Sequence, residues 1–149
     1  TPLWSYLMHW GLFLFALIGW YYVETIDWLA SLRMSDFRRF NQKYKTLISV
    51  FIILVLSVLV YSSAQGVWIA WIAIPLMVWS LCLMFKKELP DSTRFLLFLA
   101  GTALFITLFV EFFSLRGDLG RMNMVFKFYL QAWVLLSPVA AFAIVSARS

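Results

Sequence analysis

Five long runs of apolar residues alternate with short polar segments along this chain. The runs cover residues 3–22, 47–64, 67–85, 95–113 and 126–145. A helix that crosses a bilayer needs about 20 mostly apolar residues, so each run is close to the required length. Backbone groups in lipid must be hydrogen-bonded within the segment, and the runs lack the alternation of a barrel strand. We therefore predict an all-α fold, an integral membrane helical bundle of about five transmembrane helices.

The connections between the runs predict two further features. Only Gln65 and Gly66 separate the second run from the third, which predicts a tight antiparallel hairpin. The connection after the first run is long, and basic residues lie between its apolar ones. These apolar residues recur at near-helical spacing: Leu29, Leu32, Phe37, Phe40 and Tyr44. This pattern predicts an amphipathic helix in the headgroup region, with its basic face toward anionic lipid.

Composition supports the membrane interpretation. The chain is 64% hydrophobic and 13% charged, whereas a soluble domain is about half apolar and about a quarter charged. The formal net charge of +5 would suggest nucleic acid in a soluble domain. Here the basic residues lie between apolar spans, where they set membrane topology, so we expect lipid and no nucleic acid as a partner.

We predict that the whole chain, residues 1–149, is one transmembrane helical region. It begins at Thr1 and enters an apolar run almost at once, without the basic segment or cleavage site of a signal peptide. We therefore expect a fragment or cleaved product of a larger polytopic protein. Other transmembrane helices or subunits are expected partners.

Loop lysines and arginines predict the orientation of a multi-pass protein in the cell membrane. The first and third loops and the chain end carry most of them: Arg33, Arg38, Arg39, Lys43, Lys45, Lys86, Lys87, Arg94 and Arg148. The opposite side holds an uncharged second loop and a fourth loop with Arg116, Arg121 and Lys127. We predict that the first and third loops are cytoplasmic and that the N-terminus lies outside.

Polar residues gather where the fourth run ends and the fifth begins. Glu111 is a carboxylate within the apolar segment LFVEFF, and an ionisable residue in a span usually faces the bundle interior or a watery cavity. Asn123, Lys127 and Gln131 stand four residues apart and so share one helix face. We predict a cluster at the outer membrane surface that binds substrate: Glu111, Asp118, Arg121, Asn123, Lys127 and Gln131.

This cluster has two interpretations, and the residue types leave both open. Basic side chains beside carboxylates and amides can hold a phosphate, while a carboxylate orients a sugar hydroxyl or a metal. Alternatively, Lys127 reaches toward the interface and Glu111 pairs with it or with Arg121, which locks two helices together. The sequence has no zinc spacing, phosphate-binding glycine loop or hydrolase triad. It therefore assigns no catalytic residue and no cofactor.

His9 is the only histidine and lies inside the first run, next to Trp10. A lone histidine in a membrane can ligate the metal of haem or chlorophyll, and the neighbouring tryptophan can stack on the macrocycle. The more common role is a hydrogen bond to a neighbouring helix. The cofactor therefore stays unknown, with His9 as the one candidate metal ligand.

One segment resembles a known family. Residues 111–136 read EFFSLRGDLGRMNMVFKFYLQAWVLL, which is similar to a signature of the YYY family of large polytopic membrane proteins of uncharacterised function. That signature pairs a carboxylate-ended helix with an R-M-N-x-V-F-K-F-Y-x-Q-x-W helix start. The opening TPLWSYLMHWGLFLF, residues 1–15, also resembles a segment that precedes the signature. The resemblance implies a relationship to type C glycosyltransferases, which use lipid-linked sugar donors at the outer membrane face.

Two functions follow as hypotheses. The resemblance implies a membrane-embedded segment of a glycosyltransferase-like protein, whose outer cluster binds a polyprenyl-phosphate sugar. The catalytic carboxylates of those transferases lie in an early outer loop that this sequence lacks, so enzyme activity is left unassigned. The alternative is a non-enzymatic accessory subunit of a larger electron-transfer or photosynthetic complex. Co-purification with other subunits and a pigment or haem spectrum would favour the alternative.

Overall fold

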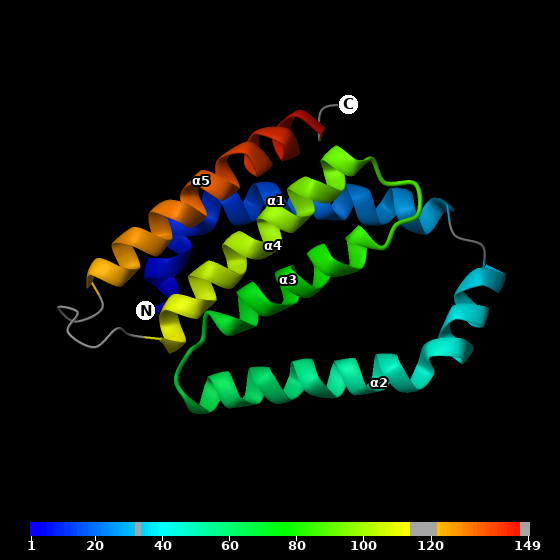
Figure 1. The fold of residues 1–149 in the computed structure, drawn as a ribbon, viewed down its shortest axis with the longest axis horizontal. Coiled ribbons are helices and arrows are strands. Elements are labelled where there is room, and N and C mark those ends of the chain that lie inside the picture. Colours follow the sequence, from blue (N-terminus) through cyan, green and yellow to red (C-terminus); the bar gives the residue numbers. More distant parts are fainter. Residues whose placement is uncertain (32–33, 114–121, 147–149) are drawn as a thin grey trace.

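The protein is a bundle of helices in the computed structural model (Figure 1). The structure describes the backbone of residues 1–31, 34–113 and 122–146 and the side chains of residues 1–31, 44–113 and 123–146. Within these residues it has five helices: α1 (Leu3–Ser31), α2 (Met34–Ala64), α3 (Ala70–Met84), α4 (Asp91–Phe112) and α5 (Met122–Ser146). The predicted all-α membrane bundle is confirmed.

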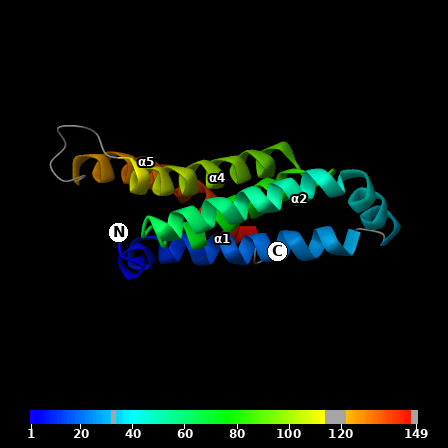
Figure 2. The same cartoon turned by 90° about the horizontal axis from the view of Figure 1, so that it is seen from below.

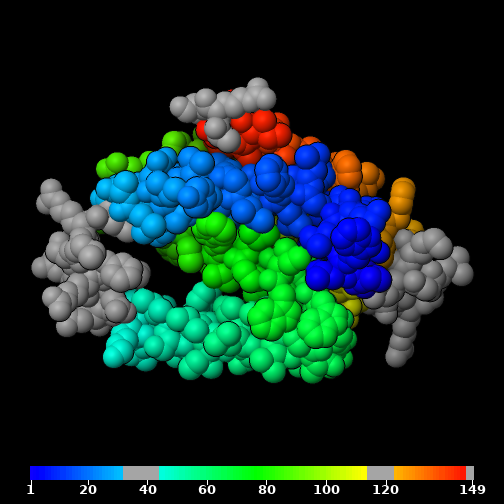
Figure 3. Space-filling model, turned by 180° about the vertical axis from the view of Figure 1, so that it is seen from behind, coloured from blue at the N-terminus to red at the C-terminus, as the bar shows by residue number. Residues whose placement is uncertain are grey.

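The helices form two layers around a shared core. α4 packs against both α3 and α5, and α1 packs across α5 and α3. Figure 2 shows α1 on one side of the layer that contains α4 and α5. α2 contacts α3 at the edge of the bundle, and Figure 3 shows α3 between α1 and α2.

Among the described residues, four helical segments are long and apolar enough to cross a membrane: Leu3–Ser31, Tyr44–Ala64, Asp91–Phe112 and Asn123–Ser146. The third predicted span is a shorter apolar helix, because α3 has 15 residues. At 1.5 Å per residue it is about 22 Å long, which is less than the ~30 Å hydrocarbon core. Residues 67–69, which we expected in this span, form turns instead, with the amide of Ala70 donating to Val67 O and that of Trp71 to Trp68 O.

The predicted hairpin between the second and third spans is confirmed. The amide of Val67 donates to the carbonyl of Ser62 (2.9 Å) and that of Gly66 to the carbonyl of Ser63 (3.0 Å), the bond pattern of a Schellman helix end. Gly66 has φ +75°, in the left-handed region that favours glycine. The chain therefore reverses within a few residues, and α3 returns along α2.

The predicted interfacial helix is not a separate element: Leu29 belongs to α1, Leu32 lies outside the described residues, and the remaining part forms the start of α2 and is continuous with the second span. In Figure 1 the first turns of α2 run at an angle to the rest of the helix. The side chains of residues 34–43 lie outside the described side chains, so the basic face remains a prediction. From Tyr44 onward α2 is mostly uncovered, with 11% of its most apolar stretch buried.

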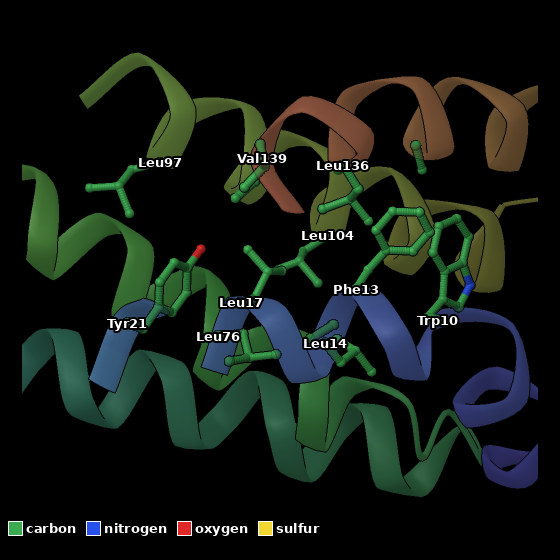
Figure 4. Close-up of a cluster of buried hydrophobic side chains, with 14 of the residues drawn as sticks. Trp10, Phe13, Leu14, Leu17, Tyr21, Leu76, Leu97, Leu104, Leu136 and Val139 are labelled. Carbon is green, nitrogen blue, oxygen red and sulfur yellow. The ribbon is translucent and has the colours of Figure 1, made fainter. Parts of the chain in front are cut away.

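Large apolar side chains fill the core, and most of them come from α1, α3, α4 and α5. Leu17, Leu97, Leu104 and Leu136 are almost completely buried. Figure 4 shows them meeting between the helices, with Trp10 and Phe13 projecting from α1 toward α5. α3 and α4 approach closely at Gly101, where an added Cβ would lie 3.8 Å from Ser80 Cβ. Small residues at such contacts allow helices to pack tightly in lipid.

Alternate connections lie at opposite ends of the bundle. The start of α1, the α2–α3 turn, the end of α4 and the start of α5 share one end, which we call the Glu111 end (Figure 1). The end of α1, the α3–α4 connection and the end of α5 share the other, the Lys86 end. This is the alternation that the loop charges require. The orientation itself, with the Glu111 end outside the cell, remains a prediction.

Candidate functional site

Glu111 faces protein rather than lipid. Its side chain is 3% exposed, and the backbone nitrogen of Thr1 lies 2.7 Å from its Oε2. The hydroxyl of Thr1 donates to its Oε1. One turn earlier in α4, the buried Thr107 hydroxyl lies 3.0 Å from the hydroxyl of Tyr6. These contacts tie the first turns of α1 to the end of α4, and they supply hydrogen bonds that a carboxylate in an apolar helix needs.

The expected ion pair between Glu111 and Lys127 is not among those that the described residues form. α4 and α5 are adjacent and antiparallel, as expected. However, Lys127 is exposed on the outward face of α5, whereas the Glu111 side chain is buried against α1. The expected alternative partner, Arg121, lies outside the described residues, and so does Asp118.

The three described polar residues at the start of α5 share one exposed face, as their spacing predicts. We call Asn123, Lys127 and Gln131 the α5 stripe, and all three are exposed. Gln131, the deepest of them, borders a groove of about 370 Å³ between α4 and α5. Apolar side chains form the rest of this α4–α5 groove: Ile106, Leu130, Val134 and Leu135. The cation of the stripe thus stands one turn above an apolar groove that opens to lipid.

A second groove of about 370 Å³ lies on the other side of Leu130, between α1 and α5. We call it the aromatic groove, and its lining is His9, Val125, Phe126, Tyr129, Leu130 and Trp133. Behind it Trp10 packs edge-on against Tyr129, with ring centroids 5.1 Å apart. Leu130 lines both grooves and separates them.

The structure separates His9 from Trp10. His9 is exposed at the aromatic groove, while Trp10 is 1% exposed and packed in the core. Consecutive helical residues point about 100° apart, so the two side chains can lie on different faces of α1. The buried Trp10 ring is therefore not available to stack on a macrocycle at His9, as the metal-ligand interpretation required. No cluster of three His, Cys, Asp or Glu side chains suited to a metal occurs in the described part of the chain.

A second polar cluster, at the Lys86 end, was missed by the sequence analysis. Lys86 Nζ lies 3.0 Å from Glu24 Oε2, and each side chain is 18% exposed. Beside this pair, the Trp79 indole donates to Thr25 Oγ1 (2.8 Å). The signal was present in Glu24, a carboxylate at the end of an apolar run. Its partner lies 62 positions away, two residues after the end of α3, and only the packing of α1 on α3 reveals it.

Comparison with known proteins gives one match. A family model described as an uncharacterized membrane protein (DUF2298) matches residues 1–136. The matched region includes α1 to α4, the α5 stripe and both grooves. No curated protein and no solved structure matches the chain.

Proposed function

This chain belongs to the DUF2298 family of uncharacterized membrane proteins, and on that premise we propose that it binds a phosphate carried by a lipid. The lipid is a polyprenyl-phosphate sugar, the substrate class that the resemblance to the YYY family and type C glycosyltransferases implies. In this proposal the chain is a membrane-embedded segment of a glycosyltransferase-like protein. The observation that carries it is the position of the α5 stripe above the α4–α5 groove.

Charge at the start of α5 suits an anion. Lys127 is exposed and makes no ion pair among the described residues, so its ammonium group can meet a lipid phosphate. Asn123 lies in the first turn of α5, where free backbone N–H groups and the helix dipole add partial positive charge. A phosphate at this depth would receive a charge-assisted contact from the lysine and hydrogen bonds from the amide side chain.

The groove suits the chain of the same lipid. Gln131 stands one turn deeper than Lys127, about 6 Å along the helix axis. Below it the apolar side chains of Ile106, Val134 and Leu135 line the groove between α4 and α5. A single isoprenoid chain can follow this surface while its phosphate stays at Lys127. The headgroup then projects toward the Glu111 end.

Glu111 has a positioning role in this proposal. Its carboxylate is buried and bonded to Thr1, which fixes the start of α1 against the end of α4. The contact holds the Glu111 end of the bundle together beside the stripe. No catalytic residue is proposed, and the proposal concerns binding alone.

The test is lipid binding by the full chain in nanodiscs. Polyprenyl phosphate should bind in a saturable manner, whereas the uncharged polyprenol and inorganic phosphate should bind far more weakly. Lys127→Ala should lower polyprenyl-phosphate affinity about ten-fold, because a charge-assisted contact contributes roughly 1.5–3 kcal/mol. Lys87→Ala is the matched control, since Lys87 is also exposed but lies at the Lys86 end, and it should leave the affinity unchanged.

Two results would contradict the proposal. One is full polyprenyl-phosphate affinity in a folded Lys127→Ala protein. The other is equal binding of polyprenol and its phosphate, which would show that the groove holds a chain without recognising the anion. If Lys127→Ala unfolds, Lys127→Gln keeps the stem of the side chain and removes the charge, so the comparison can still be made.

A separate observation favours the accessory-subunit function. α2 lies at the edge of the bundle and buries 11% of its most apolar stretch, far less than α1 or α4 with 39% each. Such a helix can pack against transmembrane helices of other subunits. Purification in mild detergent should then yield partners in fixed stoichiometry, and a monomeric protein without bound subunits would argue against this function.

A further inference from the structure

The aromatic groove is chemically distinct from the α5 stripe. The described residues that line it include an imidazole and a phenol but no carboxylate, lysine or arginine. These side chains offer nothing to neutralise a phosphate, and desolvating an unpaired anion against them would be costly. Leu130 separates it from the α4–α5 groove. Its occupant is thus an uncharged molecule, distinct from the lipid phosphate proposed above.

Aromatic surfaces dominate this groove. Phe126, Tyr129 and Trp133 line it from α5, and His9 borders it from α1. The Trp133 ring is held in place by Phe13, whose ring meets it edge-on with centroids 5.0 Å apart. Fixed aromatic faces favour a flat ring in an offset or edge-on arrangement. The groove therefore offers aromatic surfaces against which the flat ring of a bound molecule can pack.

A hydrogen-bond donor lies beside these rings. The exposed His9 imidazole borders the groove and can donate one N–H. A donor next to aromatic faces suits an occupant that carries a carbonyl oxygen on its ring.

We propose that the aromatic groove binds an uncharged, ring-headed lipid of the prenylated quinone class. The ring lies against Trp133 and Phe126, a ring carbonyl accepts from His9, and the prenyl chain leaves along α5 into the bilayer. A volume of about 370 Å³ is near the lower end of the usual range for small-molecule sites. This size suits a single ring better than a four-ring macrocycle.

The test uses decylubiquinone and the full chain in nanodiscs. Quinones quench tryptophan fluorescence, so a bound quinone should add a saturable component to the linear quenching caused by partition into lipid. His9→Leu should weaken the saturable component roughly three- to ten-fold, the loss expected for one hydrogen bond. Decylbenzene, which has a ring and a chain but no carbonyl, should compete poorly.

Variants separate this site from other surfaces. Trp133→Leu should abolish quinone retention, measured by absorbance after gel filtration so that the missing fluorophore does not matter. Trp68→Leu is the matched control, because Trp68 is an exposed tryptophan in the α2–α3 turn, and it should retain the quinone. Lys127→Ala should also retain it, which makes this result independent of the phosphate proposal.

Three outcomes would overturn the inference. Quenching that stays linear with quinone concentration would show partition into lipid alone. Equal affinity in the His9→Leu/Trp133→Leu double variant would place any quinone elsewhere. Haemin binding with a Soret shift that depends on His9, without saturable quinone binding, would assign the groove to a tetrapyrrole.

Discussion

The hydroxyl of Tyr6 donates to the hydroxyl of Thr107 across 3.0 Å, and both side chains are buried. The direction follows from Thr107, whose own proton is donated to the carbonyl of Leu104 at 2.8 Å. The bond joins α1 to α4 over 101 sequence positions. The bond therefore contributes to the stability of the helix packing at the Glu111 end.

This hydrogen-bond direction predicts that removal of the Thr107 hydroxyl and removal of the Tyr6 hydroxyl lower the stability of the fold by different amounts. Thr107→Val leaves the Tyr6 hydroxyl buried without an acceptor and should destabilise the fold by about 1–3 kcal/mol. Tyr6→Phe leaves Thr107 still bonded to Leu104 and should cost only about 0.5–1.5 kcal/mol. Unfolding in detergent, run as a double-mutant cycle, measures both. A larger loss in Tyr6→Phe than in Thr107→Val would reverse the assigned direction.

The ion pair between Glu24 and Lys86 should matter more than a surface pair. Lys86→Met leaves a mostly buried carboxylate without its cation and should cost roughly 1–3 kcal/mol. Asp91→Asn removes a pair to Arg94 in which the Asp91 side chain is 98% exposed, so it should cost about 0–1 kcal/mol. Denaturant unfolding of both variants provides the comparison. Equal losses would show that the Glu24 pair contributes no more than an exposed one.

Substitution of Gly66 should destabilise the fold through its backbone conformation and not through a steric clash. Gly66→Ala places a Cβ in open space but at φ +75°, which should cost about 1–2 kcal/mol. Gly11→Ala is the matched control, since its Cβ also meets nothing within 4 Å but the residue is helical. That change should be neutral or stabilising by up to about 1 kcal/mol. Similar changes in the unfolding temperature of the two variants would show that the left-handed conformation of Gly66 does not determine the cost.

Labelling tests the predicted orientation. In a Cys82→Ser background, Gly66→Cys should react with an impermeant maleimide added outside intact cells, because the α2–α3 turn lies at the Glu111 end. Lys87→Cys should react only after the membrane is opened, because the loop lysines are expected in the cytoplasm. Reaction of position 66 from the cytoplasmic side alone would invert the topology.

Local sequence determined the parts of this protein that depend on local physics. Burial of apolar runs in lipid requires helices, so the runs in the sequence located every helix that the structure describes. Gly66 marked the hairpin, because a sharp helix end favours a residue that tolerates positive φ. The four-residue spacing of Asn123, Lys127 and Gln131 predicted their shared face, since helical periodicity is a property of one segment.

Tertiary packing decided which residues meet. Periodicity predicts which residues share a face but not which helix covers it, so the contact of Glu111 with Thr1 and that of Glu24 with Lys86 were not predicted. Trp10 lies in the core and not beside a macrocycle site at His9, because α5 covers its side of α1. The aromatic groove exists only where His9 and Trp133 are brought together from helices far apart in sequence. Such contacts depend on how the helices pack side by side, and hydropathy along one chain carries no information about that.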